Sequence, residues 1–139
     1  MLKHINKEDV FSVEYYDKPD GTYPVEEFIL NSEIKMQAKI FKMLDLLSER
    51  GTELREPYSA PLEDGIFELR IIQGSNIARV LYFFVIGKKI ILTNGFIKKT
   101  NKTPRKEILL AKSRKDEYLQ RSANNDKKLQ GNSKSTIKQ

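Results

Sequence analysis

The sequence contains no cysteine and only one histidine, His4. The lack of cysteine and the scarcity of histidine exclude several kinds of chemistry. Without cysteine the chain has no disulfide, no thiolate nucleophile and no cysteine-ligated metal. A single histidine cannot build a histidine-based metal cluster, so we expect a site that works without a metal or another cofactor. No stretch approaches the ~20 apolar residues needed to cross a bilayer, and residues 1–10 lack an apolar signal segment. We therefore expect a cytoplasmic protein without a membrane partner.

Positive charge is concentrated in the last third of the chain. Residues 1–97 carry 12 Lys+Arg and 15 Asp+Glu, a net charge of −3, whereas residues 98–139 carry 13 and 4, a net charge of +9. A basic third on a mildly acidic body indicates a polyanionic partner, either a nucleic acid or an acidic protein segment. A solvated charged helix and tail would give the same counts, so charge alone leaves both interpretations open.

The first half of the chain predicts one strand and two helices. Residues 10–16 alternate and are rich in β-forming residues, which favours a strand, and a short helix begins at Tyr23-Pro24. A longer helix is expected from Ser32 to Arg50, with Gly51 as its natural stop. Its apolar stripe, expected to face the core, comprises Ile34, Ala38, Phe41, Leu44 and Leu47, broadened by Ile40 and Met43.

The second half predicts a three-stranded meander and a last helix. Residues 52–65 contain two prolines and a glycine and read as an exposed loop. Three strand candidates follow, joined by short turns and therefore antiparallel. They span residues 66–73, 77–86 and 89–97. A helix begins near Thr103-Pro104, and beyond Arg121 the chain has almost nothing apolar to bury.

Together these elements predict a single α+β domain. A chain of 139 residues has room for one compact domain with a core but hardly for two. We expect the order β-α-α-β-β-β-α, with helices on one face of a twisted antiparallel sheet and a C-terminal helix. The domain should occupy residues 1–121, and residues 122–139 should form a basic, flexible tail.

Arginines at interior strand positions are the most informative feature of the meander. Burying Arg70 or Arg79 is costly unless a carboxylate or an external anion lies nearby. If Gln73 pairs with Asn76, the two arginines lie opposite each other on one sheet face, which also carries Glu68. A shift of one residue would put them on opposite faces, and the sequence does not decide between these registers.

A cationic turn follows the third strand of the meander, with Lys98, Lys99 and Lys102 close together. Several cations around one small sheet indicate a phosphate site. The alternatives are a solvated turn, and an ion pair of Arg70 with Glu68 or Glu63.

Three short strings, taken in their order and spacing, carry a resemblance to a known family. They are LEDGIFELR at residues 62–70, ARVLY at 78–82, and GFIKKT at 95–100 with KTP at 102–104. In these strings the chain resembles the RelE/ParE superfamily of bacterial toxins, most closely its phage-derived, HigB-like branch, over roughly residues 10–121. The resemblance implies a RelE-like fold and a toxin neutralised by a helix-turn-helix, HigA-like antitoxin, in a complex expected to be a heterotetramer.

The resemblance also implies roles for single residues. Arg79 matches the phosphate-stabilising arginine of the family, Arg70 a cation on the preceding strand, and Lys98 and Lys99 another essential cation. Two features depart from the family pattern: no tyrosine follows Lys99 until Tyr118, and Asn94-Gly95-Phe96 stands where some HigB enzymes have histidines.

The implied activity is ribosome-dependent cleavage of messenger RNA, in which the 2′-hydroxyl attacks the adjacent phosphate without a metal. Catalysis would fall to Arg70, Arg79, Lys98 and Lys99, because preorganised cations stabilise the charge that develops on the phosphate. RNA contacts are expected from Lys102, Glu68 and Tyr82, although Tyr82 also fits simple sheet packing. The alternative is a non-catalytic, ParE-like toxin that inhibits DNA gyrase.

Overall fold

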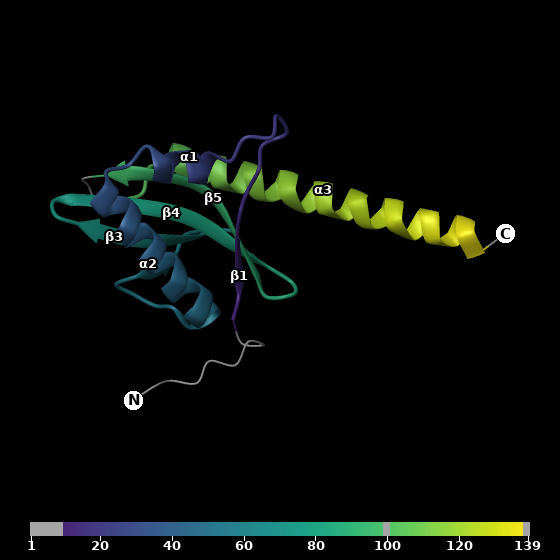
Figure 1. Cartoon of the computed structure of the whole chain (residues 1–139), viewed down its shortest axis with the longest axis horizontal. Helices are drawn as coiled ribbons and strands as arrows, with labels where there is room; N and C mark the ends of the chain where they lie inside the picture. The colour runs from purple at the N-terminus through teal and green to yellow at the C-terminus, as the bar shows by residue number, and fades with distance from the viewer. Residues whose placement is uncertain (1–9, 99–100, 138–139) are drawn as a thin grey trace.

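A computed structural model describes residues 10–98 and 101–137, with side chains up to Lys127. Figure 1 shows two N-terminal helices, a central sheet and a long C-terminal helix. In chain order the elements are β1 (Ser12–Tyr15), α1 (Pro24–Leu30), α2 (Ile34–Arg50), the 3-10 turn η2 (Gly51–Glu53), β2 (Ser59–Pro61), β3 (Phe67–Gln73), β4 (Asn76–Val85), β5 (Lys89–Lys98) and α3 (Arg105–Ile137). No helix in this part of the chain is both long and apolar enough to cross a membrane.

The sheet has five strands in the order β1-β5-β4-β3-β2, and it is mixed rather than antiparallel. The predicted meander of β3, β4 and β5 is confirmed, but β1 runs parallel to β5, pairing Ser12 with Lys89. Two parallel strands cannot be joined by a tight turn and need a long crossover connection. Helices α1 and α2 provide it, because they return the chain across the sheet before the meander begins. The expected loop at 52–65 contains β2, a strand too short to show periodicity, which pairs with β3 through Ser59 and Leu69.

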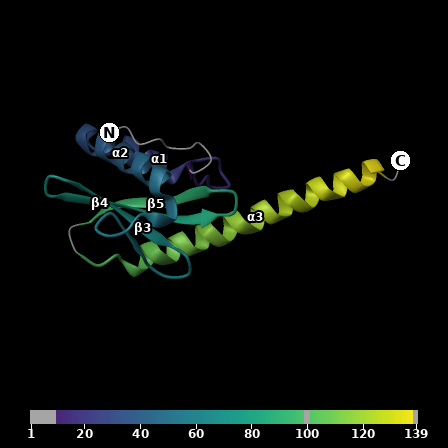
Figure 2. The same cartoon turned by 90° about the horizontal axis from the view of Figure 1, so that it is seen from below.

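Helices cover both faces of the sheet, not one face as expected. Helices α1 and α2 pack on one side and α3 on the other, which is clear when the molecule is seen from below (Figure 2). Strand β4 explains this arrangement, because it is apolar on both sides. Val80 and Tyr82 belong to the core beneath α1 and α2, and Leu81 and Phe83 to the core beneath α3.

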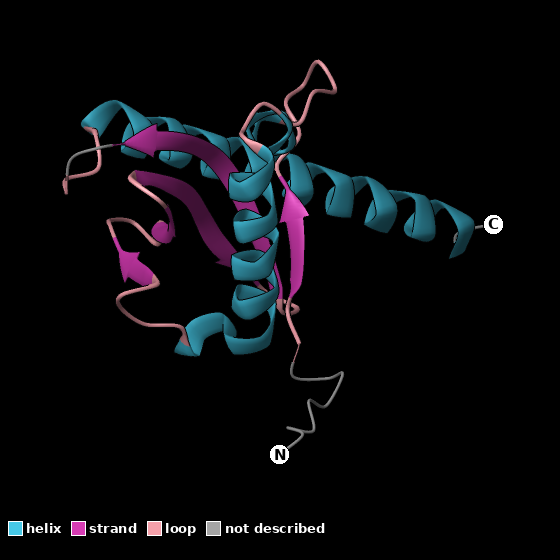
Figure 3. Ribbon diagram, turned by 60° about the vertical axis from the view of Figure 1, so that its left-hand side comes forward, coloured by secondary structure: helices cyan, strands magenta, loops and turns pink. Residues whose placement is uncertain are grey.

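Helix α2 buries only part of the stripe that its sequence predicted, namely Ile40, Met43, Leu44 and Leu47. Figure 3 shows α2 lying across the strands, with β1 beside it. The buried residues are Met36, Ile40, Met43, Leu44 and Leu47. Ile34 is 83% exposed and Phe41 45%, and Ala38 is exposed as well. The helix carries two apolar stripes, and its docking on the sheet decides which of them becomes core.

Helix α3 is longer than expected and continues through the segment predicted to be a tail. Its 33 residues end at Ile137, and its C-terminal part extends beyond the sheet in Figures 1 and 2. Residues 122–137 contain no proline, and a polar helix can project into solvent without a packed face. The segment after Arg121 is therefore helical as far as Ile137, while its flexibility and the domain boundary at residue 121 stay predictions.

Contacts with the residues after β1 attach the middle of α3 to the domain. The buried Tyr16 donates a hydrogen bond from its hydroxyl to Oε1 of Glu117 at 2.7 Å. Its ring lies near two guanidinium groups, those of Arg114 at 5.7 Å and Arg121 at 5.6 Å. Arg121 also pairs with Asp17 at 3.1 Å. These contacts hold α3 so that its N-terminus lies beside the end of β5.

Candidate functional site

The register of the β3–β4 hairpin brings the two interior arginines together. Gln73 pairs with Asn76, and Arg70 therefore lies directly opposite Arg79. Both side chains are on the α3 face of the sheet, with Glu68 on the same face of β3. This confirms the first of the two registers that the sequence allowed. Two arginines in opposed positions repel each other unless an anion lies between them.

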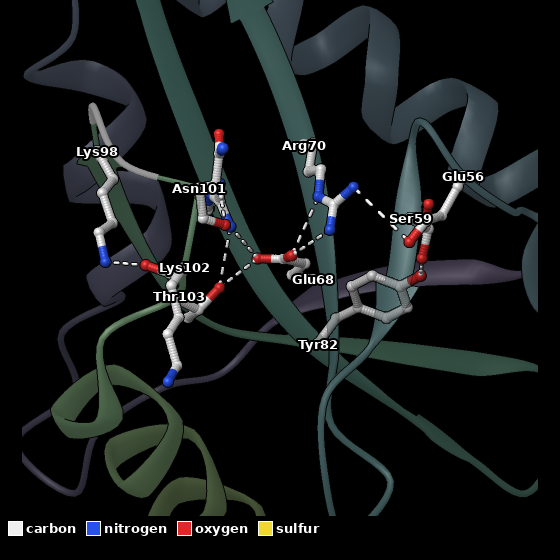
Figure 4. Close-up of polar contacts among 10 residues, drawn as sticks. Glu56, Ser59, Glu68, Arg70, Tyr82, Lys98, Asn101, Lys102 and Thr103 are labelled. Carbon is white, nitrogen blue, oxygen red and sulfur yellow. Dashed lines mark hydrogen bonds and ion pairs between the residues drawn. The ribbon is translucent and has the colours of Figure 1, made fainter.

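The anion between the arginines is the carboxylate of Glu68, which pairs with both of them. Figure 4 shows this carboxylate between Arg70 and Thr103. Its Oε1 accepts hydrogen bonds from Nη1 of Arg79 at 2.8 Å and from the hydroxyl of Thr103 at 2.6 Å. Its Oε2 lies 3.0 Å from both Nε and Nη2 of Arg70. We call Glu68, Arg70, Arg79 and Thr103 the Glu68 cluster. The ion-pair interpretation of Arg70 is thus confirmed with Glu68, while Glu63 pairs with Arg105 and Lys112 instead.

Arg79 and Arg70 differ in their access to solvent. The side chain of Arg79 is only 4% exposed, and it also donates from Nη1 to Thr103 and from Nη2 to the carbonyl of Asn101, both at 3.0 Å. The side chain of Arg70 is 28% exposed and approaches the exposed Glu56 at 3.9 Å. Arg70 can therefore meet an external anion, whereas Arg79 is enclosed by protein groups.

The electrostatics of Glu68 favour the charged carboxylate despite its burial. Burial alone raises the pKa of Glu68, but the hydrogen bonds from Thr103 and Arg79 outweigh it and hold the pKa below its ordinary value. The side chain of Glu68 is 2% exposed, so the cluster contains a buried ion pair. Removing one partner from such a pair is strongly destabilising, because the other charge stays buried without compensation.

The lysines predicted from the cationic turn lie at the edge of the cluster. Lys98, at the end of β5, donates from Nζ to the carbonyl of Lys102. The side chain of Lys102 is exposed. Lys99 lies outside the described residues. The structure therefore links Lys98 to the segment of residues 101–103, which Arg79 contacts through Asn101 and Thr103.

Tyr82 is not part of this group. It lies on the opposite face of the sheet, 1% exposed, with its ring stacked on Phe67 at a centroid distance of 5.6 Å. Its hydroxyl forms a hydrogen bond with Ser59 at 2.5 Å, and burial raises its pKa. A side chain in this position fits the packing interpretation, because an RNA base cannot reach it without opening the core.

Thr103 and Asn101 are the members of the site that the sequence did not reveal. Thr103 precedes Pro104 and the first turn of α3, so its pattern predicted only the start of a helix. Its hydroxyl instead reaches across to β3, and the backbone of Asn101 accepts from β4. No local sequence signal marks such contacts, because each joins positions more than twenty residues apart.

The arrangement can present positive charge to an anion beside the sheet. Arg70, Arg79 and Lys98 supply three positive charges, and Glu68 neutralises one of them. The Glu68 cluster and the adjacent lysines together therefore keep an excess of positive charge. Arg70, Lys98 and Lys102 are the cations of this site nearest to solvent. Such a group of guanidinium and ammonium donors is suited to a phosphate.

Comparison with known families gives one match. A family model described as Phage derived protein Gp49-like (DUF891) matches residues 27–116, from within α1 to the first third of α3. The matched region contains the whole Glu68 cluster. A search of curated proteins finds no match.

Proposed function

We propose that this protein, which belongs to the phage-derived Gp49-like family of RelE/HigB-like toxins, is the toxin of a toxin-antitoxin system. We also propose that it is a member of the HigB-like branch. The observation that carries the proposal beyond the family is the placement of Arg70 opposite Arg79, with Lys98 bonded to the segment that Arg79 contacts. A group of this kind suits a polyanionic target.

The proposed activity is that of a ribosome-dependent endoribonuclease acting on translated messenger RNA. The 2′-hydroxyl of the substrate attacks the adjacent phosphate, and a cyclic phosphate and a free 5′-hydroxyl result. Arg70, Arg79, Lys98 and Lys99 supply the positive potential where negative charge develops on the phosphate oxygens. The ribosome supplies the alignment of the messenger, which compensates for modest acid–base machinery.

The proton-transfer groups are proposed among the lysines. Glu68 is poorly suited to the role of general base, because both of its oxygens accept hydrogen bonds and its pKa is lowered. Tyr82 is buried on the other face of the sheet. Lys98 and Lys99 are therefore the proposed general acid and base, and Lys102 is a proposed RNA contact.

The proposed partners follow from the same premise. A HigA-like antitoxin with a helix-turn-helix neutralises the toxin, and the complex is a heterotetramer. The toxin acts in the cytoplasm, where it meets the ribosome and the messenger.

A second candidate function is inhibition of DNA gyrase without catalysis. It is favoured by the missing acid–base residues, since the tyrosine nearest to the cluster in sequence, Tyr82, faces away from it. In that case the basic residues would serve for docking on a protein target.

Mapping of messenger ends after induction separates the two functions. We expect in-frame cuts within coding regions after induction of the wild type, together with growth arrest. Arg70→Gln and Lys98→Ala should each weaken both effects, with losses of ~10–10³ in cleavage rate. Lys127→Ala, an exposed position on α3 far from the cluster in sequence, serves as the matched control and should leave both effects unchanged. Growth arrest without any cuts by the wild type would refute the nuclease and favour gyrase.

A further inference from the structure

We infer that Arg79, Glu68 and Thr103 are positioning residues, which fix the segment Asn101–Thr103 and through it Lys98, so that Arg79 acts on the substrate through this segment rather than by touching it. The inference rests on the proposed function, and it departs from the direct phosphate contact that the superfamily resemblance implies for Arg79. In the described part of the site, the cations nearest to solvent that remain for the phosphate are Arg70, Lys98 and Lys102.

Protein groups surround the guanidinium of Arg79. Among the described residues, its guanidinium forms hydrogen bonds of 2.8 to 3.0 Å from Nη1 to Glu68 and Thr103 and from Nη2 to the carbonyl of Asn101. The side chain is 4% exposed. A phosphate oxygen that bound Arg79 directly would have to enter this buried position, because the guanidinium is enclosed by protein groups.

The contacts of Glu68 and Arg79 lead from the sheet to an irregular segment. Glu68 and Arg79 belong to neighbouring strands, β3 and β4, whose relative position is set by the sheet. Asn101 and Thr103 belong to the irregular segment that connects β5 with α3. Contacts between the two groups therefore attach an irregular segment to a rigid one, and such supporting contacts hold a reactive group in place.

The attached segment also holds the side chain of a lysine. The carbonyl of Lys102 lies between Asn101 and Thr103 in the chain, and it accepts the hydrogen bond from Nζ of Lys98. If the segment moves, the ammonium group of Lys98 loses its partner and its position. Because a misplacement of about 1 Å can cost ~10²-fold in rate, such a contact has consequences for catalysis without touching the substrate.

The test uses Thr103, because its hydroxyl can be removed with little change of shape. Thr103→Val deletes the hydroxyl that bonds Glu68, and Thr103→Ser keeps it. With programmed ribosomes as substrate, we expect Thr103→Val to lower kcat ~10–100-fold with KM changed less than threefold, and Thr103→Ser to keep at least a third of the wild-type rate. Unfolding temperatures of both variants should stay within a few degrees of the wild type.

A second measurement does not depend on activity. The chain contains no cysteine, so a nitroxide on Lys102→Cys reports on the segment alone. Its electron paramagnetic resonance spectrum should show restricted motion in the otherwise wild-type protein and with Thr103→Ser, and faster motion with Thr103→Val. Identical spectra in all three would overturn the inference, even if the wild type failed to cleave messenger and the proposed function fell.

A double-mutant cycle separates positioning from direct contact. If Arg79 acts through the segment, the variant combining Arg79→Lys with Thr103→Val should lose no more than a few-fold beyond the more severe single variant, because both changes release the same segment. If Arg79 touches the phosphate, the two fold-losses should multiply. Multiplying losses, or a Thr103→Val variant that cleaves at the wild-type rate, would overturn the inference.

Discussion

Replacement of Glu68 by alanine should be among the most destabilising single substitutions in this protein. The change leaves the guanidinium of Arg79 buried without its carboxylate, in a pair whose side chains are 4% and 2% exposed. Breaking one side of a buried pair costs about 3–5 kcal/mol. Arg70 adds little to the loss, because at 28% exposure it can turn toward water.

The loss can be measured by urea unfolding, followed by circular dichroism. With a slope of about 2 kcal/mol per molar urea for a domain of this size, a loss of about 4 kcal/mol shifts the midpoint by about 2 M. Glu56→Ala is the control, since Glu56 approaches the same Arg70 from an exposed position and should shift the midpoint little. The combination of Glu68→Leu with Arg79→Met should recover most of the stability, because an apolar pair removes both buried charges.

The same reasoning predicts a pH dependence with a definite sign. The pKa of Glu68 is lowered in the folded protein, because the hydrogen bonds from Thr103 and Arg79 outweigh the effect of burial. Its contribution to stability is therefore present above its ordinary pKa of 4.5 and is lost as the pH falls through the lowered value. The stability difference between the wild type and Glu68→Gln should shrink on acidification. A midpoint shift below about 0.5 M for Glu68→Ala, or a double variant as unstable as the sum of its parts, would refute the account of a buried ion pair.

Three further predictions concern other parts of the fold. Gly95→Ala should lower the free energy of unfolding by about 1–3 kcal/mol, because its Cβ would lie 2.5 Å from the ring of Phe28; an unchanged urea midpoint would contradict this. Burial and the hydrogen bond to Glu117 raise the pKa of Tyr16 to about 12, so its stabilising contribution should be complete below pH 10 and lost between pH 10 and 12. An alkaline absorbance titration should show a late-titrating phenol that Tyr16→Phe removes. Hydrogen bonds from Arg105 and Lys112 lower the pKa of Glu63 to about 2. The difference in stability between the wild type and Glu63→Gln should therefore narrow from pH 5 to pH 2.5. A constant difference would count against these contacts.

Local patterns in the sequence were sufficient for most of the secondary structure. The strands of the meander, the helix that ends at Gly51 and the single α+β domain all follow from period, turn residues and glycine stops. The sequence could not show which apolar residues of α2 become buried, because Ile34 and Phe41 are as apolar as the residues that the sheet buries. The same limit applies to β2, which exists only through its pairing with β3.

For the candidate site, the sequence determined which charged residues are present and that an arginine within a strand needs an anionic partner. Only the tertiary structure decided the partner. The β3–β4 register placed Arg70 opposite Arg79, and the packing of α3 on the second face brought Thr103 onto Glu68. A carboxylate, a hydroxyl and a guanidinium recognise one another over a few ångströms in space, whereas patterns along the chain extend over a few residues. Contacts between positions 68, 79 and 103 therefore become visible only when the sheet and its two helical layers are assembled.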